Sequence, residues 1–447
     1  MIKTDSRKIK PGDTFIALKG MNKDGHNYIE NAIQNGASKV IVEHGTYNVE
    51  TIIVKNTNDY LKEYLEKKYK KIISEMKIIG VTGTNGKTTI SYLIYKMLNK
   101  LGKKCAMIGT LGYYRETKIE ELSNTCPELL KTYELINNAY ENGYKYIVLE
   151  ASSQGLQEER LYGIKFEIAI FTNLTHDHLD YHKTMEQYLK AKQKLFKQLK
   201  KAGTGIINID DEYGKYFESN NTITYGFNKS DYQIIKYKPY MFKFKHDKIY
   251  KVKNKLLGKY NSYNILSSII ALEKLGLSTK KIIKTIKNIE PPKGRIEMYK
   301  YKKNQIIVDY AHTPDAIEKV LETIKIKNNI YAVFGCTGNR DKEKRPIMTK
   351  ILLEKCNEVI ITSDDLYEEN FNNIVEDMIK NQIKDNYEII PDRKKAIEKG
   401  ISYLKKNDIL LILGKGHERY IKVKNKLIEH NDGETVIKIL ENINKKQ

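Results

Sequence analysis

The stretch that decides the fold spans residues 80–89 and reads Gly80-Val81-Thr82-Gly83-Thr84-Asn85-Gly86-Lys87-Thr88-Thr89. An apolar run, Ile78-Ile79, precedes it, and a helical pattern over residues 90–101 follows it. A strand, a glycine-rich turn and a helix in this order are typical of a phosphate-binding loop. The N–H groups of such a turn and the positive end of the helix point at one anion. An ordinary glycine-rich turn is the alternative, but Gly-Lys-Thr-Thr stands at the helix start, which favours a nucleotide site.

Two side chains at this helix start have expected roles in such a site. Lys87 would reach the terminal phosphates, and the Thr88 hydroxyl would bind Mg²⁺.

Length and composition indicate a globular protein of two or three domains. The chain has 447 residues, of which 40% are hydrophobic and 30% are charged. It contains no apolar run long enough for a membrane span. Residues 1–12 are polar and charged, unlike a signal peptide. We therefore expect a cytoplasmic protein without a membrane span.

The net charge of +22 leaves two interpretations open. A basic protein can bind nucleic acid, which would make this chain a DNA- or RNA-dependent ATPase. However, the basic residues are mostly Lys and form no dominant cluster, and Asn, Ile and Tyr are abundant as well. A general compositional bias is the simpler explanation, so we expect no nucleic-acid partner.

The cysteines indicate neither zinc nor disulfides. None of the four lies in a Cys-x-x-Cys pair or in a zinc-finger spacing. Free thiols in a reducing compartment fit best. The four residues are Cys105, Cys126, Cys336 and Cys356.

Alternating strand and helix patterns predict an α/β protein of three domains. Residues 1–57 form a small α/β unit, and a charged helix at residues 58–71 links it to the next domain. Residues 58–292 form a central parallel-sheet domain of the phosphate-loop ATPase type. Pro291-Pro292, followed by Gly294, marks a boundary. Residues 293–447 form a Rossmann-like domain.

Two strands of the central domain end in polar residues beside the predicted loop. The strand at 146–150 ends in Glu150, which could direct a metal or simply cap the strand. The strand at 168–173 leads into His176-Asp177-His178-Leu179-Asp180-Tyr181-His182. Such a cluster could suggest a transition-metal site, although turn polarity explains part of it. Residues 222–257 alternate in a way that predicts β-hairpins.

The last domain carries a second set of loops. Strands are predicted at 305–309, 330–334, 358–362 and 408–413, and polar or glycine-rich loops follow three of them, at 309–314, 335–341 and 414–418. Loops at the carboxyl ends of parallel strands build the sites of α/β sheets. The sequence therefore predicts a doubly wound fold with a second half-site.

Taken together, these motifs resemble the Mur ligase family, and most closely its MurE class. The resemblance extends from Asp5-Ser6-Arg7 to Gly414-Lys415-Gly416-His417-Glu418, nearly the whole chain. It implies an ATP-dependent, three-domain ligase of peptidoglycan synthesis that acts on UDP-N-acetylmuramoyl-L-alanyl-D-glutamate and a free amino acid. We expect a monomer. Related amide ligases, folylpolyglutamate synthase and the lipid II amidotransferase subunit, are the alternative enzymes.

The resemblance implies a set of ATP and metal residues. Lys87, Glu150, His178 and Lys192 are the expected catalytic residues. Two Mg²⁺ ions are expected, with Thr88, Glu150, His178 and a CO₂-derived carbamate on Lys192 as ligands. The ATP contacts are expected at Gly83, Thr84, Asn85, Gly86, Lys87, Thr88, Thr89, Asn264, Arg295 and Asp309.

The resemblance also implies contacts for the nucleotide-linked dipeptide. Ser6 matches a nucleotide contact in the first domain, where fewer residues precede Asp5 than is usual in the family. Asn124-Thr125-Cys126-Pro127 resembles Asn-Thr-Thr-Pro, with Cys126 in place of a Thr. Glu150-Ala151-Ser152-Ser153-Gln154 resembles Glu-x-Ser-Ser-His. Ser152 and Arg160 then match contacts to the muramoyl-peptide.

The expected amino acid depends on Asp364-Asp365-Leu366-Tyr367. Relatives that add meso-diaminopimelate carry Asp-Asn-Pro-Arg here, and Tyr367 cannot replace the Arg in an ion pair with the distal carboxylate. Asp365 adds a negative charge that suits an ammonium group. We therefore favour L-lysine, with meso-diaminopimelate or another diamino acid as the alternative if a nearby Lys replaces the Arg. Arg340, Gly414 and Glu418 match further contacts to the amino acid.

The expected reaction proceeds through an acyl phosphate. The carboxylate of the dipeptide attacks the γ-phosphate of ATP while Mg²⁺ and Lys87 screen the charges. The amine of the incoming amino acid then attacks the acyl phosphate. Closure of the domains would exclude water from this intermediate.

Overall fold

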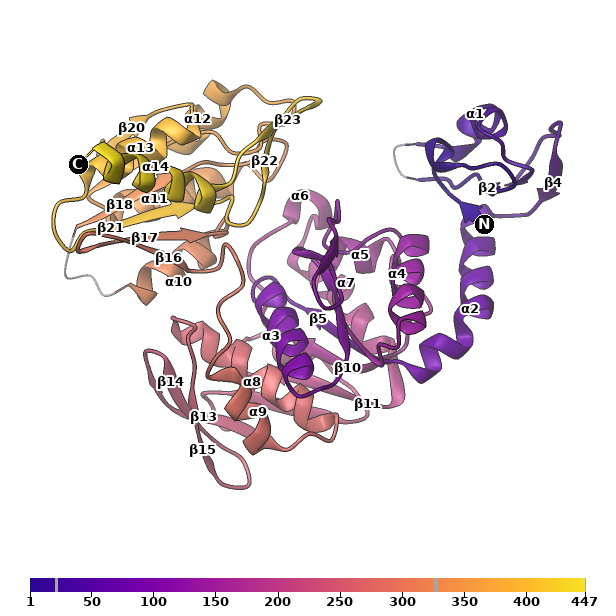
Figure 1. The fold of residues 1–447 in the computed structure, drawn as a ribbon, viewed down its shortest axis with the longest axis horizontal. Helices are drawn as coiled ribbons and strands as arrows, with labels where there is room; N and C mark the ends of the chain where they lie inside the picture. Colours follow the sequence, from indigo (N-terminus) through magenta and orange to yellow (C-terminus); the bar gives the residue numbers. More distant parts are fainter. Residues whose placement is uncertain (21–22, 325–328, 447) are drawn as a thin grey trace.

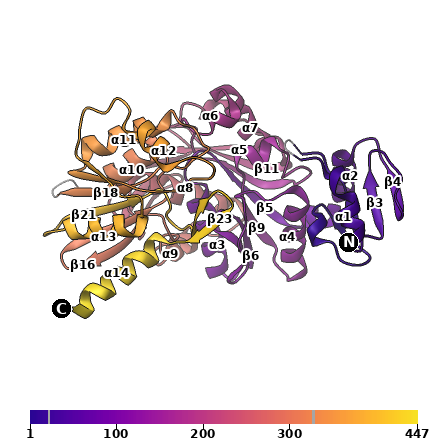
Figure 2. The same cartoon turned by 90° about the horizontal axis from the view of Figure 1, so that it is seen from above.

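The computed structural model describes residues 1–20, 23–324 and 329–446 of the chain. Its strands form three successive α/β sheets and one separate hairpin. Figures 1 and 2 show the unit around the first sheet and the unit around the third sheet at opposite ends of the molecule, with the central unit between them. This agrees with the predicted three-domain α/β fold. The exact boundaries at 57 and 292 stay predictions, and Gln447 lies outside the described residues.

The first sheet has four parallel strands in the order β1-β2-β3-β4. A short strand, β1, precedes Asp5, and the Asp5-Ser6-Arg7 turn lies between β1 and β2. The helix α2 leads from this unit to the centre (Figure 1), and its apolar side packs beside α4. The elements are β1 (Ile2–Lys3), η1 (Ser6–Lys8), β2 (Thr14–Ile16), η2 (Gly25–Tyr28), α1 (Ile29–Gln34), β3 (Lys39–Val42), β4 (Glu50–Ile53) and α2 (Thr57–Glu75).

The central sheet has eleven strands, in the order β15-β14-β13-β12-β11-β10-β5-β9-β6-β7-β8. Its strands are parallel from β13 to β6, and antiparallel strands extend both edges. The hairpins predicted at 222–257 are therefore only partly correct, because β12 pairs with β13 in parallel. Helices α2, α4 and α7 cover one face, and α3, α8 and α9 cover the other.

The elements of the central unit follow the alternation that the sequence predicts. They are β5 (Lys77–Thr82), α3 (Lys87–Lys100), β6 (Cys105–Gly109), β7 (Gly112–Tyr114), β8 (Lys118–Glu120), α4 (Leu129–Glu141), β9 (Tyr146–Glu150), α5 (Ser153–Gln157), β10 (Phe166–Phe171), α6 (Leu179–His182), α7 (Met185–Lys197), β11 (Leu199–Asn208), η3 (Gly214–Tyr216), β12 (Thr222–Gly226), β13 (Tyr232–Lys238), β14 (Met241–Lys245), β15 (Ile249–Lys253), α8 (Lys259–Lys274) and α9 (Thr279–Ile286).

The third sheet has the order β16-β17-β21-β18-β19-β20 and is parallel except for β16. Helices α10 to α12 cover one face, and α13 and α14 cover the other. The elements are β16 (Glu297–Tyr301), β17 (Asn304–Asp309), α10 (Pro314–Thr323), β18 (Ile330–Phe334), α11 (Lys344–Lys355), β19 (Glu358–Ile361), α12 (Phe371–Ile379), β20 (Tyr387–Ile389), α13 (Arg393–Tyr403), β21 (Ile409–Leu413), β22 (Tyr420–Val423), β23 (Lys426–Glu429) and α14 (Asp432–Lys446).

Both large sheets direct their carboxyl ends at one cleft. The loops after β5, β9, β17, β18, β19 and β21 all contribute to its lining. The four cysteines are free and buried. Within the described ranges, no helix is long and apolar enough to cross a membrane.

Candidate active site

The turn between β5 and α3 requires glycine at two positions. Gly83 has a φ of +144°, and a Cβ there would lie 1.8 Å from Oγ1 of Thr172. Gly86 has a φ of +93°, and a Cβ there would lie 2.6 Å from Oδ1 of Asn264. Side chains rarely adopt such backbone angles. The glycines of the predicted phosphate loop therefore serve both its turn and its close contact with neighbouring side chains.

Two lysines converge on one carbonyl of this loop. The Lys87 Nζ atom donates to the carbonyl oxygens of Gly83 and Thr84, at 2.9 Å each. Lys192, on α7, donates its Nζ to the same Gly83 oxygen at 2.9 Å. Burial lowers the pKa of both amines, and the charge of Lys87 lowers the pKa of Lys192 further. The structure thus places Lys192, which only the resemblance identified, directly beneath the phosphate loop.

The carboxylate at the end of β9 faces the start of α3. Glu150 accepts hydrogen bonds from the Thr88 hydroxyl at 2.9 Å, from the Thr110 N–H at 2.9 Å and from the Thr110 hydroxyl at 3.0 Å. Arg295 Nη2 lies 3.4 Å from the Thr88 hydroxyl. Burial raises the pKa of Glu150. Adjacent carboxylate and hydroxyl oxygens are ligands that Mg²⁺ prefers, so these side chains fit the ion.

The histidine-rich turn does not gather into one metal cluster. His178 Nε2 lies 3.3 Å from Asp177, whereas His176 pairs with Asp341 at 3.1 Å. The His182 ring is buried and stacks on Tyr188 with ring centroids 5.0 Å apart. The three histidines therefore do not share one site: His176 lies with Asp341 and Glu343, with ligand atoms within 4.8 Å of one another, while His178 remains at the cleft.

Besides the His176–Asp341 and Arg295–Thr88 contacts, further polar contacts join the central unit to the third. The Asn85 side chain donates to Asp315, at the start of α10, at 2.7 Å. Lys344, at the start of α11, lies 3.4 Å from Asp177. Burial alone would raise the pKa of Asp177, but His178 and Lys344 hold it below its usual range. The predicted ATP site is therefore enclosed by both units.

The remaining predicted ATP residues lie around the link between the two units. Asp309 accepts the N–H groups of Ile296 and Ala311 at 2.8 Å each, which orders the chain on both sides of β17. The Arg295 guanidinium lies 4.6 Å from the centre of the Tyr310 ring, and its buried Nε has no partner among the described residues. An unpaired buried donor on a residue that lines the predicted ATP site suits an anionic ligand.

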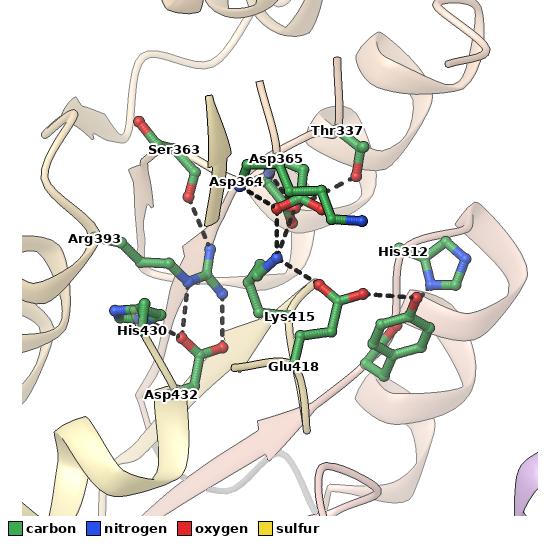
Figure 3. A network of polar contacts seen from close by, with 12 residues as sticks. His312, Thr337, Ser363, Asp364, Asp365, Arg393, Lys415, Glu418, His430 and Asp432 are labelled. Atoms are coloured by element: carbon green, nitrogen blue, oxygen red, sulfur yellow. Dashed lines mark hydrogen bonds and ion pairs between the residues drawn. The ribbon is translucent and has the colours of Figure 1, made fainter. Parts of the chain in front are cut away.

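The loops after β19 and β21 form a buried charge network, which Figure 3 shows around Lys415. The Lys415 Nζ lies 2.7 Å from Asp365 Oδ1 and 3.9 Å from Asp364 Oδ1, and it also binds Glu418. The side chain of Lys415 is fully buried, and these three carboxylates raise its pKa despite that burial. Gly414 has a φ of +107°, and a Cβ there would lie 2.7 Å from Asp364.

The aromatic ring of Tyr367 lies beside this network. The Arg340 guanidinium carbon is 5.8 Å from the ring centre, and the Lys422 Nζ is 5.5 Å from it. Both distances suit a cation over an aromatic face. Tyr367 itself has a φ of +50°, which is unusual for a bulky residue.

The predicted dipeptide contacts lie on the opposite side of the cleft. Arg160 donates to the Cys126 carbonyl at 2.9 Å and forms an ion pair with Glu158. The Ser152 hydroxyl accepts the Gly155 N–H at 3.1 Å at the start of α5. Burial raises the pKa of Cys126 to about 12, so this thiol stays protonated.

One cleft of about 730 Å³ unites most of the predicted residues. Ser6 does not line it: this residue is buried in the first unit, where its carbonyl accepts the Asn35 side chain at 3.0 Å. Four other predicted residues are also outside the lining. Three of them lie beneath it, namely Gly83, Glu150 and Lys192, and the fourth, Cys126, lies behind Thr125. The predicted residues in the lining are Thr84, Asn85, Gly86, Lys87, Thr88, Thr89, Asn124, Thr125, Ser152, Arg160, His178, Asn264, Arg295, Asp309, Arg340, Asp364, Asp365, Tyr367, Gly414 and Glu418.

Comparison with known proteins matches nearly the whole chain to one family. Residues 1–77 match the catalytic domain of the Mur ligase family, residues 81–272 match the Mur ligase middle domain, and residues 294–416 match the Mur ligase glutamate ligase domain.

The chain belongs to the Mur ligase family.

Three relatives agree with this assignment. The UDP-N-acetylmuramoyl-L-alanyl-D-glutamate–2,6-diaminopimelate ligase of Fusobacterium nucleatum is 40% identical, over 99% of this chain and 95% of that protein. The enzyme of the same name from Clostridium perfringens is 39% identical, over 98% and 94%. A solved structure of an enzyme with that name superposes with a TM-score of 0.66 at 32% identity, over 99% of this chain and 95% of that one. The predicted family and its three-domain α/β fold are confirmed.

This Mur ligase is thus an ATP-dependent acid–amino-acid ligase that requires Mg²⁺, as its family does. The individual roles of the predicted site residues stay predictions. Sequence reasoning missed four residues that the fold brings to them. Lys415 lay inside a loop that was already singled out, so its polarity could have been noticed. Thr110, Lys344 and Lys422 carried no local signal, because each contacts residues far away in the chain.

Proposed function

We propose that this Mur ligase joins meso-diaminopimelate to UDP-N-acetylmuramoyl-L-alanyl-D-glutamate at the expense of ATP, in the cytoplasmic stage of peptidoglycan synthesis. The observation that carries the proposal is the agreement in name of relatives about 40% identical over the whole chain. These names favour the alternative amino acid, and L-lysine, which the sequence favoured, finds no support in them.

The contacts of Asp365 remove one argument for L-lysine. That argument took Asp365 as a free negative charge for a substrate ammonium group. In the structure, Asp365 Oδ1 is bound by Lys415 at 2.7 Å and by the Lys422 N–H at 2.9 Å. Because its charge is already paired, Asp365 is a poor partner for a second cation.

The cleft supports the following sequence of events. ATP would lie on the loop between β5 and α3, with its terminal phosphates at Lys87. The dipeptide carboxylate attacks the γ-phosphate and forms an acyl phosphate, with ADP leaving. The amine of the amino acid attacks the acyl carbon, and phosphate and a proton leave as the amide forms. Glu418 and Asp364 lie on the third unit's side of the cleft, where the amino acid would bind.

The metal and carbamate complete the proposal. Thr88 and Glu150 would hold one Mg²⁺, and His178 with a carbamate on Lys192 would hold the second. Bound Mg²⁺ would offset the negative charge of the phosphates. The lowered pKa of Lys192 favours the neutral amine, which can add CO₂ and release one proton.

The test measures phosphate release and amide formation with purified enzyme, ATP, Mg²⁺ and UDP-N-acetylmuramoyl-L-alanyl-D-glutamate. Meso-diaminopimelate, L-lysine and L-ornithine are compared at equal concentrations. Preference for meso-diaminopimelate supports the proposal. Equal or better use of L-lysine overturns the choice of amino acid, and no phosphate release with any of the three overturns the ligase reaction itself.

A further inference from the structure

Two cations lie close to the ring of Tyr367. The Arg340 guanidinium and the Lys422 ammonium lie 5.8 and 5.5 Å from its centre, and all three side chains line the cleft. Within residues 1–20, 23–324 and 329–446, neither cation has an ion-pair partner. An unpaired cation that lines a cleft is a suitable partner for an anionic ligand.

The backbone holds Lys422 firmly in this place. Its carbonyl accepts the N–H groups of Leu366 at 2.8 Å and Tyr367 at 3.2 Å. Its own N–H donates to Asp365 Oδ1 at 2.9 Å. Strand β22 is thereby fastened to the loop after β19, and the half-buried Lys422 side chain places its Nζ 5.5 Å from the centre of the Tyr367 ring. A pre-positioned cation loses little entropy when it binds an anion.

The three carboxylates of the Lys415 network cannot supply that anion. Asp365 and Glu418 are both bound by Lys415, and Asp364 lies 3.9 Å from the same amine. The ammonium of Lys422 therefore remains available to a ligand that enters the cleft. A ligand with an additional carboxylate would match it, whereas L-lysine would bring a third cation to the same place.

We propose that Lys422 binds the distal carboxylate of the amino-acid substrate and thereby selects a diamino dicarboxylate over L-lysine. The ring of Tyr367 lies 5.5 Å from the Lys422 Nζ, and Arg340 adds a second positive charge beside the ring. This inference depends on the proposed use of meso-diaminopimelate. Lys422 would thus supply the positive charge that an Arg at position 367 supplies in relatives that add meso-diaminopimelate.

The test compares Lys422→Gln with Lys426→Gln, an exposed lysine on the other strand of the same hairpin. KM and kcat are measured for meso-diaminopimelate and for L-lysine, with ATP and the nucleotide-linked dipeptide saturating. Lys422→Gln removes a charge-assisted hydrogen bond to the substrate, so the loss of binding free energy should raise KM for meso-diaminopimelate roughly tenfold or more. KM for L-lysine should not rise, and Lys426→Gln should match the wild type. Lys422→Glu should shift the preference toward L-lysine.

Three outcomes would overturn the inference. An unchanged KM for meso-diaminopimelate in Lys422→Gln excludes the contact. An equal loss with both amino acids assigns Lys422 a structural role, which circular-dichroism melting of the variant checks independently. If the wild-type enzyme does not use meso-diaminopimelate, the proposed function fails before any variant is compared, and the inference fails with it.

Discussion

Replacement of Arg393 by methionine would break a fully buried ion pair behind the amino-acid pocket. Arg393 donates from Nε and Nη2 to the two Asp432 oxygens, at 2.8 Å each, and both side chains are inaccessible to solvent. Its Nη2 also donates to the Leu413 carbonyl at 2.8 Å, and its Nη1 donates to the Ser363 carbonyl at 3.3 Å. Figure 3 shows this pair beside the Lys415 network.

The expected loss follows from these contacts. Removal of one partner of a buried pair costs roughly 3–5 kcal/mol, because the remaining charge stays buried and unpaired. Leu413 and Ser363 directly precede Gly414 and Asp364, so the variant should also loosen the amino-acid pocket. We expect KM for the amino acid to rise while KM for ATP stays unchanged, since the phosphate loop lies on another unit.

Amide hydrogen exchange gives the free energy of opening for each strand. A loss of 3–5 kcal/mol corresponds to exchange faster by roughly 10²- to 10³-fold or more at the amides of β21, with little change in β5. Lys394→Met, an exposed neighbour on α13, is the matched control. The double variant Arg393→Met, Asp432→Leu should recover most of the loss, because it leaves neither charge of this pair buried and unpaired. Less than a tenfold change in Arg393→Met, or an effect equal to that of the control, would refute this reasoning.

Three further predictions concern the loop, the carbamate and pH. Lys192→Ala should lower kcat by roughly 10²-fold and regain activity with added formate or acetate. Replacement of the exposed Lys190 by alanine should leave kcat unchanged. Undiminished activity of Lys192→Ala would reject the carbamate. Gly86→Ala should raise KM for ATP by roughly tenfold, because backbone strain and the Asn264 contact distort the loop. Gly102 has a φ of +72° and open space around it, so Gly102→Ala should leave KM for ATP unchanged. Equal KM values for the two variants would contradict the loop geometry. Burial would raise the pKa of Asp432, but Arg393 and His430 hold it below its usual range. The stability that ionised Asp432 contributes is therefore fully present above the unfolded pKa near 3.9 and is lost as pH falls toward its lower folded-state pKa. Protection of β21 should accordingly decline from about pH 4 to about pH 2 in the wild type and less in Asp432→Asn.

Much of the ligase could be predicted because its signals are local. The phosphate loop needs glycines, Lys87 and Thr88 within a few residues of one another, and a strand followed by a helix is visible in the apolar pattern. Glu150 could be assigned to a strand end, and the loop at residues 414–418 to the next half-site, for the same reason. The L-lysine interpretation shows the limit of local reasoning, since it took Asp365 as a free charge.

The sequence by itself determined the family, the order of the units and the chemistry of the phosphate loop, because these depend on neighbouring residues. Only the tertiary structure decided which charges are paired. Lys192 reaches the Gly83 carbonyl across 109 positions, and Lys415 reaches Asp365 across 50. Such contacts form when packed elements bring distant side chains into one low-dielectric interior, where pairing fixes both protonation and specificity. The availability of Lys422 for a substrate carboxylate follows from that pairing and from no local pattern.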